Sequence, residues 1–330
     1  MAHTVLVTGA NGFLGNHIVR VLLQQGFRVI AMVRPHSDIR SLEGVDCTIE
    51  RGQLDDPEDI DRMVCKSDYI IHCASMTSPH STDLNLYKKV NVHTTRLLAE
   101  AGERYGIKRF VLVSTANCFT NGSLEQPGTE ASGFMPWLRH SGYAYSKHLA
   151  QEYILGKSRR ENFPAIVVAP TFLVGPYDTR PSSGALLLYA LKNRLLFCPR
   201  GGKSFADVRA VAVATANALS MGRTGECYLL SGENLDYATY FRKIASITGK
   251  RKSMLPLPEQ LQGLFGLACR VVPYRKIRLL KTHMRMLSLD NYFSNHKAKT
   301  ELQMPDTDID KAITDAITWF EKEGYLKGTG

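Results

Sequence analysis

The sequence predicts an α/β protein with a doubly wound parallel sheet and a smaller C-terminal lobe beside it. Two observations carry this prediction. In the first half of the chain, short apolar segments of strand length alternate with segments of helical length, an order typical of a parallel sheet covered by helices on both faces. At residues 5–15, an apolar strand runs directly into a glycine-rich turn and the start of a helix.

The expected elements follow one another regularly up to about residue 170. The strands expected there are residues 4–8, 28–33, 47–50, 69–73, 110–114 and 165–169, and the helices between them are residues 15–25, 57–65 and 84–105. A loop with glycine, serine and proline is expected at about 120–139, followed by a helix that contains Tyr143. After about residue 171 prolines and glycines interrupt the pattern, and residues 228–231 are expected to form a further strand.

Three glycines in the first turn, Gly9, Gly12 and Gly15, each have a physical task. The first permits a sharp turn, the second lets the backbone approach a pyrophosphate at the helix start, and the third lets the helix pack closely on the sheet. The spacing GxxGxxG differs from the usual GxGxxG fingerprint, and a tight turn without a ligand is the alternative. The flanking strand and helix favour a Rossmann-type dinucleotide site. Its expected cofactor contacts are Thr8, Gly9, Asn11, Gly12, Phe13, Leu14 and Gly15.

We therefore expect residues 1–170 to form a Rossmann-type dinucleotide-binding domain that includes the helix of Tyr143. Residues 171–330 are expected to build mainly a substrate-binding lobe, with one or two segments returning to the sheet. Late elements in this architecture lie over the carboxyl edge of the sheet, where ligands bind. No change in composition marks a linker, so the two regions are expected to share an interface.

A tyrosine and a lysine one helical turn apart, Tyr143 and Lys147, supply the candidate chemistry. At positions i and i+4 they share one face of the helix. Free tyrosine has a pKa of about 10 and is a poor base at neutral pH, and a nearby ammonium is expected to lower that pKa. Such a tyrosine can exchange a proton with a substrate oxygen. Tyr145 points to another face, so Tyr143 is the candidate.

Composition limits the classes of function. The chain has 41 basic and 31 acidic residues and a net charge of +10. Because the basic residues are spread out, a solvated basic face is favoured over a nucleic-acid site. Seven cysteines without CxxC or Cys/His spacing predict neither a metal site nor a full disulfide framework. The early first strand leaves no room for a signal peptide, and no apolar stretch has the length of a membrane span. We expect a cytoplasmic protein without stable membrane insertion.

Landmarks along nearly the whole chain support the two motifs. They are His72-Cys73-Ala74-Ser75, Asn91-Val92, Val113-Ser114-Thr115, Pro170, Val174-Gly175-Pro176, Phe205-Ala206-Asp207-Val208 and a closing segment at residues 319–326. With the GxxGxxG turn and the YxxxK pair, they make the chain resemble an extended short-chain dehydrogenase/reductase of the NAD(P)-dependent epimerase/dehydratase family. It is similar to dihydroflavonol-reductase-like members of that family.

The resemblance implies further site residues. Thr115, with Ser114 as the alternative, would hydrogen-bond the substrate oxygen beside Tyr143, although a hydroxyl that caps the strand end is a serious alternative for Ser114. Lys147 would tune Tyr143 and bind the nicotinamide ribose. The cofactor would also contact Leu54, Cys73, Ala74, Ser75, Asn91, Tyr143, Pro170 and Val174. A structural role is at least as plausible for Asn91, and core packing suits Val174 equally well.

The end of the second strand distinguishes NADP from NAD. An acidic residue there binds the ribose 2′-OH and selects NAD, whereas this chain has Arg34. Arginine suits a 2′-phosphate because it is permanently charged and can bind it bidentately. Arg34, with Ser37 or Arg40 nearby, therefore favours NADP. NAD stays possible, since an exposed arginine at a strand end needs no ligand.

Within the family, the motifs favour a carbonyl reductase or alcohol dehydrogenase. Dehydratase relatives have an Asp-Glu pair after the catalytic Thr, where this chain has Ala116-Asn117. Sugar-nucleotide epimerases have an arginine where this chain offers Lys203, with Arg200 as a substitute. The expected substrate-facing residues are largely apolar: Met76, Cys118, Phe119, Trp137, Phe172 and Leu173. We expect an NADP-dependent oxidoreductase that interconverts a carbonyl and a secondary alcohol on a small, largely apolar substrate, with an NAD-dependent sugar-nucleotide epimerase as the alternative.

Partners follow from the same resemblance. Besides the small-molecule substrate, a homodimer is expected through residues 84–105 and 143–155. A dinucleotide-sensing regulator is disfavoured because such relatives lack the Tyr/Lys pair. The basic, partly apolar residues 261–289 are expected to pack as helices of the substrate lobe, with a position on an anionic membrane as the alternative.

Overall fold

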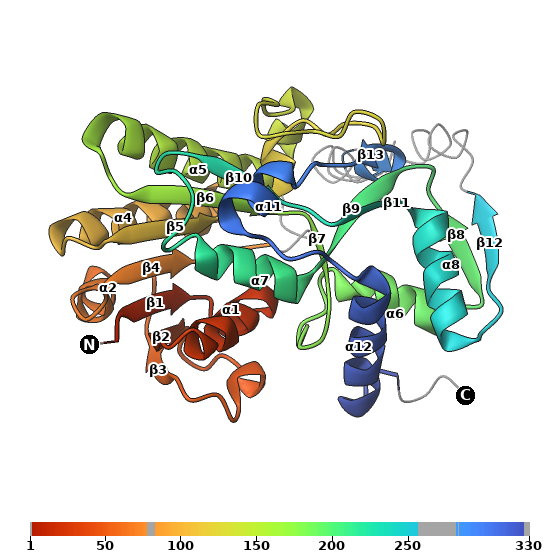
Figure 1. The fold of residues 1–330 in the computed structure, drawn as a ribbon, viewed down its shortest axis with the longest axis horizontal. Helices are drawn as coiled ribbons and strands as arrows, with labels where there is room; N and C mark the ends of the chain where they lie inside the picture. The colour runs from red at the N-terminus through yellow and green to blue at the C-terminus, as the bar shows by residue number, and fades with distance from the viewer. Residues whose placement is uncertain (1, 78–82, 257–281, 283, 327–330) are drawn as a thin grey trace.

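A seven-stranded parallel sheet forms the centre of the fold (Figure 1), seen in a computed structural model that describes residues 2–77, 83–256, 282 and 284–326. Its strands are β1 (Thr4–Thr8), β2 (Arg28–Val33), β3 (Thr48–Arg51), β4 (Tyr69–His72), β5 (Arg109–Val113), β6 (Ala165–Pro170) and β10 (Cys227–Leu230). Their order is β10-β6-β5-β4-β1-β2-β3, and every neighbouring pair is parallel. The order reverses at β1, so the predicted doubly wound sheet is confirmed.

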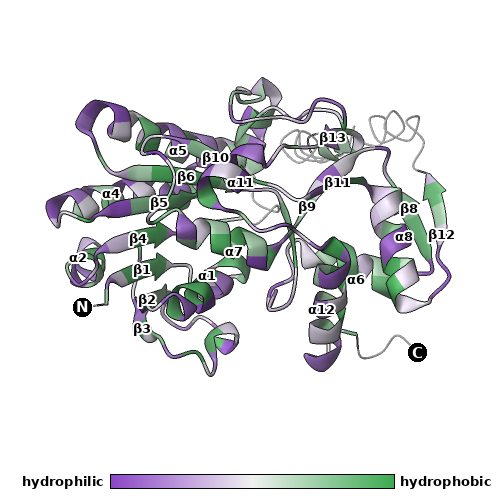
Figure 2. Ribbon diagram, in the orientation of Figure 1, coloured by the Kyte–Doolittle hydropathy of each residue, from purple (hydrophilic) through white to green (hydrophobic). Residues whose placement is uncertain are grey.

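Helices cover both faces of this sheet. One face carries α1 (Phe13–Gln24), α7 (Val208–Asn217) and α11 (His296–Leu302), and the other carries α2 (Pro57–Val64), α4 (Thr94–Arg104) and α5 (Gly142–Glu161). Alternate residues of one strand supply both cores, because Val5 and Val7 pack under α1 whereas Leu6 packs on the opposite side. This explains why the inner strands, such as β1, β5 and β6, are largely apolar (Figure 2), whereas the edge strand β3 is polar and mostly exposed.

The predicted helix over residues 84–105 is confirmed over residues 84–104, and it contains a π-helical turn that the sequence did not predict. The segment consists of α3 (Leu84–Lys88), the π-helical turn η2 (Lys89–His93) and α4. The wide turn contains the buried Asn91, whose side-chain amide bonds other segments. π-helical turns inside helices occur frequently at functional sites, so this irregularity points to the region around Asn91.

The second half contributes more strands than its sequence pattern predicts. A four-stranded sheet contains β7 (Phe172–Val174), β9 (Gly202–Asp207), β11 (Glu233–Asp236) and β13 (Asp290–Asn291), and a separate pair contains β8 (Leu195–Cys198) and β12 (Ser253–Pro256). Helices α6 (Gly184–Lys192), α8 (Tyr237–Thr248) and α12 (Ile309–Lys322) pack in an apolar cluster with these strands. Short helical turns complete the described chain: η1 (Arg40–Leu42), η3 (Ala116–Cys118) and η4 (Pro136–His140). Most of residues 261–289, for which the sequence offered two positions, lies outside the described residues.

Glycine is required in the first turn by close backbone contacts. Gly9 has φ +67°, and a Cβ there would lie 2.7 Å from the Cα of Ala74 at the end of β4. A Cβ on Gly15 would lie 2.2 Å from the carbonyl oxygen of Gly9. The third glycine is therefore needed by the turn itself, not by the contact of helix and sheet that the sequence suggested.

The Gly9→Ala substitution is expected to destabilise the protein more than Gly44→Ala does. Both glycines have positive φ, +67° and +70°, but a Cβ on Gly44 would meet no atom within 4 Å. Gly44→Ala should lower the free energy of unfolding by about 1 kcal/mol, and Gly9→Ala by about 3 kcal/mol, because a backbone clash adds to the left-handed conformation. Urea unfolding measures both, and equal losses would contradict the contact at Ala74.

Candidate active site

The carboxyl edge of the central sheet brings Tyr143, Lys147 and Thr115 together. Lys147 is buried, and its Nζ donates to the carbonyl oxygen of Val113, the last residue of β5, at 2.5 Å. Thr115 follows two residues later, and its hydroxyl acts on the pKa of the Tyr143 phenol, so the two side chains lie near each other. The structure thus joins the two predicted motif residues of α5 to the predicted hydroxyl after β5.

Local sequence fixes the start of α5 and with it the position of Tyr143. The side chain of Ser141 caps the helix by accepting from the backbone N–H of Ala144 at 3.3 Å. Gly142 follows, and a Cβ there would lie 2.3 Å from the ring of Tyr87. Since α3 and α5 approach this closely, the first turn of α5 cannot shift without moving α3.

Burial dominates the ionisation of the catalytic pair. It raises the pKa of Tyr143 to about 12, although the neighbouring Thr115 hydroxyl acts in the opposite direction. Burial also lowers the pKa of Lys147, to about 8. The predicted lowering of the tyrosine pKa is therefore wrong for the protein alone. Desolvation destabilises the phenolate by more than the neighbouring groups stabilise it. At neutral pH Tyr143 is a neutral phenol, which is the form that donates a proton.

Ser114 and Thr115 have different surroundings. The hydroxyl of Ser114 donates to Oε1 of Gln151 on α5 at 2.8 Å and lies 3.4 Å from the sulfur of Cys118. It is buried among these groups, whereas the Thr115 hydroxyl meets Tyr143. The geometry favours Thr115 over Ser114 as the substrate-polarising hydroxyl, and that role stays a prediction.

Asn91 links three segments of the site. Its Oδ1 accepts from the backbone N–H of Met76 at 2.7 Å and from the hydroxyl of Ser75 at 3.1 Å. Its Nδ2 donates to the carbonyl oxygen of Met76 at 3.2 Å and to the hydroxyl of Ser146 at 2.8 Å. With its amide fully bonded, Asn91 holds the segment after β4 against α5, which is the structural role that the sequence analysis left open.

A buried histidine connects the first turn to the same segment. The Nδ1 of His72 lies 2.7 Å from Oγ1 of Thr8, which accepts from the backbone N–H of Ala74 at 3.3 Å. The Nε2 of His72 lies 3.0 Å from Oγ1 of Thr95, which donates to the carbonyl oxygen of Asn91 at 2.7 Å. These directions assign the neutral tautomer protonated on Nε2. Burial lowers the pKa of His72 to about 3, so the imidazole stays neutral.

The start of α1 fits a dinucleotide phosphate. Gly12 is its N-cap, no side chain caps the helix, and its first turn contains no acidic residue. A Cβ on Gly12 would have one near neighbour, the carbonyl oxygen of Gly9 at 3.1 Å. The amide of Asn11 donates to the carbonyl oxygen of Asp38 at 2.7 Å and so joins this turn to the loop after β2. Free amide groups at a helix start suit an anion.

The loop after β2 distinguishes the two candidate arginines. Arg34 is exposed, and within the part of the chain that the structure describes its side chain makes no hydrogen bond or ion pair. The guanidinium of Arg40 is instead bound to the carboxylate of Asp38, with Nη2–Oδ2 at 2.8 Å and Nε–Oδ2 at 3.0 Å. Ser37 donates to the carbonyl oxygen of Arg34 at 2.8 Å. The expected help from Arg40 and Ser37 is therefore not supported, because both are already bonded.

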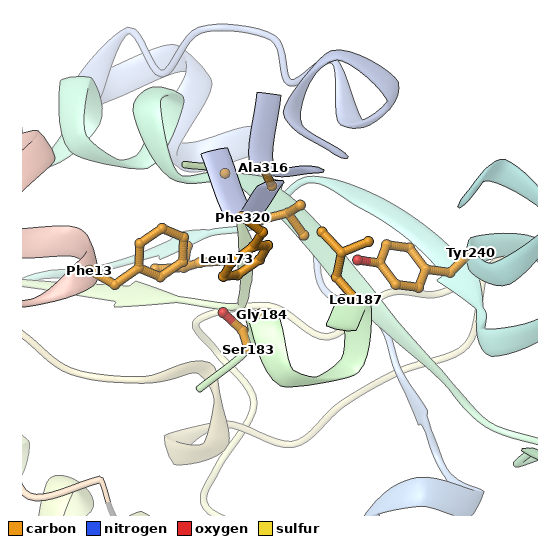
Figure 3. Close-up of a pocket in the computed structure, with 10 residues that line it drawn as sticks. Phe13, Leu173, Ser183, Gly184, Leu187, Tyr240, Ala316 and Phe320 are labelled. Atoms are coloured by element: carbon orange, nitrogen blue, oxygen red, sulfur yellow. The ribbon is translucent and has the colours of Figure 1, made fainter. Parts of the chain in front are cut away.

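The remaining predicted cofactor residues lie at or near the same edge. Cys73, Ala74 and Ser75 follow β4, Pro170 ends β6, and Leu54 packs on the core side that carries α2 and α4. Phe13 reaches a small apolar cavity together with Leu173, Leu187 and Phe320 (Figure 3). Val174 also lines this cavity and is buried in the C-terminal cluster, which agrees with its packing role, and its contact with a nicotinamide stays a prediction.

Two residues that the sequence analysis did not assign complete the site. Gln151 holds Ser114 and lies at i+4 from Lys147, so it continues the face of α5 that Tyr143 and Lys147 define. Thr95 holds His72 and follows Asn91 by the same spacing. This periodicity was the signal available in the sequence for both residues.

Comparisons with known proteins agree with this geometry. The sequence model of the NAD dependent epimerase/dehydratase family matches residues 5–217. The chain is 28% identical to sterol demethylase protein B of Methylococcus capsulatus, over 98% of this chain and 100% of that protein. It is 24% identical to the decarboxylating sterol-4-alpha-carboxylate 3-dehydrogenase of Dictyostelium discoideum, over 90% and 94% of the two chains. The crystal structure of gox2253 has a TM-score of 0.86 and 28% identity, and the match covers 98% and 100%.

Stability is expected to fall in mild acid because two buried histidines resist protonation. The folded pKa values of about 3 for His72 and about 4 for His17 lie below the ordinary histidine value of 6.5, and burial is the main cause of both. Their contribution is complete above pH 6.5 and is lost as the pH falls. Each histidine should lower the free energy of unfolding by about 1.4 kcal/mol per pH unit below its unfolded pKa.

Urea unfolding between about pH 6 and pH 4.5 measures this slope. His72→Asn should reduce it by about 1.4 kcal/mol per pH unit. The control His36→Asn removes an exposed imidazole at φ +58°, a conformation that asparagine tolerates, and should leave the slope unchanged. An unchanged slope in His72→Asn would show that His72 is not held neutral.

Proposed function

Because the chain belongs to the NAD dependent epimerase/dehydratase family, we propose that it is an NADP-dependent oxidoreductase that interconverts a carbonyl and a secondary alcohol. The observation that carries the proposal is the group of Tyr143, Thr115 and Lys147 at the carboxyl edge of the sheet. The start of α1, which follows β1 of the same sheet, has a glycine N-cap and no side-chain cap. The family is that of NAD(P)-dependent enzymes of the extended short-chain dehydrogenase/reductase type. What we propose beyond the family is the choice of NADP and the kind of substrate.

The three residues divide the work at the substrate oxygen. A bound nicotinamide would supply or accept the hydride at the neighbouring carbon. In the direction of reduction, the neutral phenol of Tyr143 donates its proton to the carbonyl oxygen, and the hydroxyl of Thr115 orients the same oxygen. The phenolate that remains is stabilised by the hydroxyl of Thr115 and by the cationic form of Lys147. Lys147 would also hold the nicotinamide ribose, since its Nζ has hydrogen-bonding capacity beyond the Val113 carbonyl.

An apolar, lipid-like substrate suits the surroundings of this group. Among the apolar residues expected at the substrate, Met76 is held by Asn91 after β4, and Phe172 and Leu173 belong to β7. The names of two relatives refer to sterols. Cys118 and Phe119, which the sequence analysis included, are instead buried in the core, where the sulfur of Cys118 lies next to the hydroxyl of Ser114. The expected contact of these two residues with the substrate is therefore not supported.

A sugar-nucleotide epimerase is the second candidate, and Lys203 favours it. Burial lowers the pKa of the Lys203 ammonium to about 8, and its Nζ lies 5.6 Å from the ring centre of Phe172. Among the described residues no carboxylate pairs with it. A cation in this position could meet an anionic group of a substrate. It lacks the fork that binds a diphosphate bidentately, so the oxidoreductase remains the first proposal.

The arrangement of domains and subunits is also proposed. Residues 1–170 would bind the dinucleotide, and residues 171–330 would mainly contact the substrate, although β10 and α7 belong to the central layers. A homodimer would form through α4 and α5. No helix in the described part of the chain is long and apolar enough to cross a membrane.

Tyr143→Phe is expected to lower kcat at least a thousandfold while the dissociation constant for NADPH changes less than threefold, because it removes the transferred proton and keeps the aromatic ring. Activity on a panel of apolar ketones, with cofactor binding followed by fluorescence, measures both. Tyr145→Phe is the matched control, since Tyr145 lies 6.2 Å from the ring of Phe134 and should keep its activity. Near-full activity in Tyr143→Phe would refute the mechanism.

Arg34→Ala is expected to weaken NADPH binding roughly 10- to 100-fold and NADH binding less than twofold, because a charge-assisted contact to the 2′-phosphate is lost. Arg28→Ala is the control, since Arg28 is exposed at the opposite end of β2. Fluorescence titrations with both cofactors measure the change, after the absorbance of the purified protein has been recorded. A preference for NADH, or a site already filled with NAD, would overturn the proposal for Arg34 and favour the epimerase.

A further inference from the structure

The two-stranded sheet of β8 and β12 has an apolar outer face. The strands are parallel and in register, with Leu195 opposite Ser253 and Phe197 opposite Leu255. Residues opposite each other point to the same side of a sheet. The exposed fractions of Leu195, Phe197 and Leu255 are 48%, 47% and 48%. We call the surface formed by these three side chains the β8–β12 face.

The fold holds this face outward. The alternate residues Leu196, Cys198 and Met254 pack inward, in the apolar cluster that also contains helices α6, α8 and α12. A shift of either strand by one residue would exchange the two sets and expose that core. The outward apolar side chains are therefore a fixed surface feature and not the result of a loose register.

The β8–β12 face lies far from the candidate active site. In Figure 1, β8 and β12 form the end of the molecule opposite the central sheet, with β12 outermost, and Figure 2 shows the apolar character of this pair. Tyr143 and Lys147 lie instead at the carboxyl edge of the central sheet. Catalysis at that edge gives no reason for three large apolar side chains to face water here.

Cationic side chains lie at one end of the face, where the parallel strands β8 and β12 begin. Lys192, Arg194, Lys250 and Arg251 are exposed and, among the residues that the structure describes, have no acidic partner. Lys252 lies among them, because besides burial the positive charges of Lys250 and Arg194 lower its pKa. Its Nζ donates to the carbonyl oxygens of Leu191 and Asn193 at 3.2 and 2.9 Å. Apolar side chains are thus bordered by uncompensated positive charge.

We propose that the β8–β12 face binds peripherally to an anionic lipid surface. Leu195, Phe197 and Leu255 would enter the boundary between headgroups and acyl chains, and Arg194, Lys250 and Arg251 would contact the lipid phosphates. A second copy of this chain is a poorer partner, because its own Leu195, Phe197 and Leu255 would offer no acidic side chain to these cations. The inference uses neither the candidate active site nor the proposed substrate.

Sedimentation with phospholipid vesicles tests the proposal on the full chain. At low salt the protein should bind vesicles of phosphatidylcholine with about a third phosphatidylserine and not vesicles of phosphatidylcholine alone. Phe197→Ser/Leu255→Ser should weaken binding roughly tenfold or more, since two apolar side chains are removed from the contact. Lys250→Glu/Arg251→Glu should weaken it by roughly 25-fold or more, at about fivefold for each positive charge removed and with the repulsion of the two added carboxylates besides.

Two matched controls separate the face from general effects. Ile49→Ser/Leu124→Ser removes apolar side chains that are 37% and 57% exposed elsewhere, and Arg28→Glu/Arg159→Glu makes the same change in net charge on exposed residues of β2 and α5. Both should bind like the unaltered protein, with circular dichroism confirming that every variant is folded. Absence of binding at low salt, or equal binding by the face variants, would overturn the proposal. So would light scattering that shows a dimer lost in Phe197→Ser/Leu255→Ser, because a second copy would then cover the face.

Discussion

The buried ammonium of Lys147 is the group on which the candidate site depends. Apolar packing alone would let α5 slide along the sheet with little change in buried area, whereas a desolvated ammonium must keep its acceptor. Its bond to the Val113 carbonyl therefore fixes the height of α5 above β5. Two more bonds in the same helix, Ser114 to Gln151 and Asn91 to Ser146, fix its rotation. Together these three hydrogen bonds fix the position and rotation of α5 on the sheet, and this brings Tyr143 next to Thr115.

The first half of the fold could be predicted because its strands are buried on both faces. Strands such as β1 and β6 are continuous apolar runs between helical segments, and that pattern is local. In β8, Leu195, Leu196, Phe197 and Cys198 are also all apolar, yet one face is exposed, so its sequence conceals the alternation that the structure shows. The other strands of the second half have two to six residues and pair with distant partners, which no short window of sequence can reveal.

The residues of the candidate site could be predicted, but not their electrostatics. Spacing along a helix gives the common face of Tyr143 and Lys147. It does not give the degree of burial, and burial decides the direction in which both pKa values move. The loop after β2 gives the same lesson, because Arg40 could be expected to assist Arg34 until the carboxylate of Asp38 is seen to bind its guanidinium. Which carboxylate binds which arginine depends on the folded loop, and the sequence alone does not show it.

The first turn of the fold is held from two sides, and this relates the cofactor position to the C-terminal half. On one side Asn11 is bonded to the loop after β2. On the other, the Nε2 of His17 in α1 donates to the carbonyl oxygen of Pro176 at 2.9 Å, and Arg20 lies over the ring of Tyr177. A dinucleotide on this turn would therefore meet a loop that belongs to the proposed substrate lobe. The distance between nicotinamide and substrate would then be set by the fold before either one binds, as hydride transfer requires.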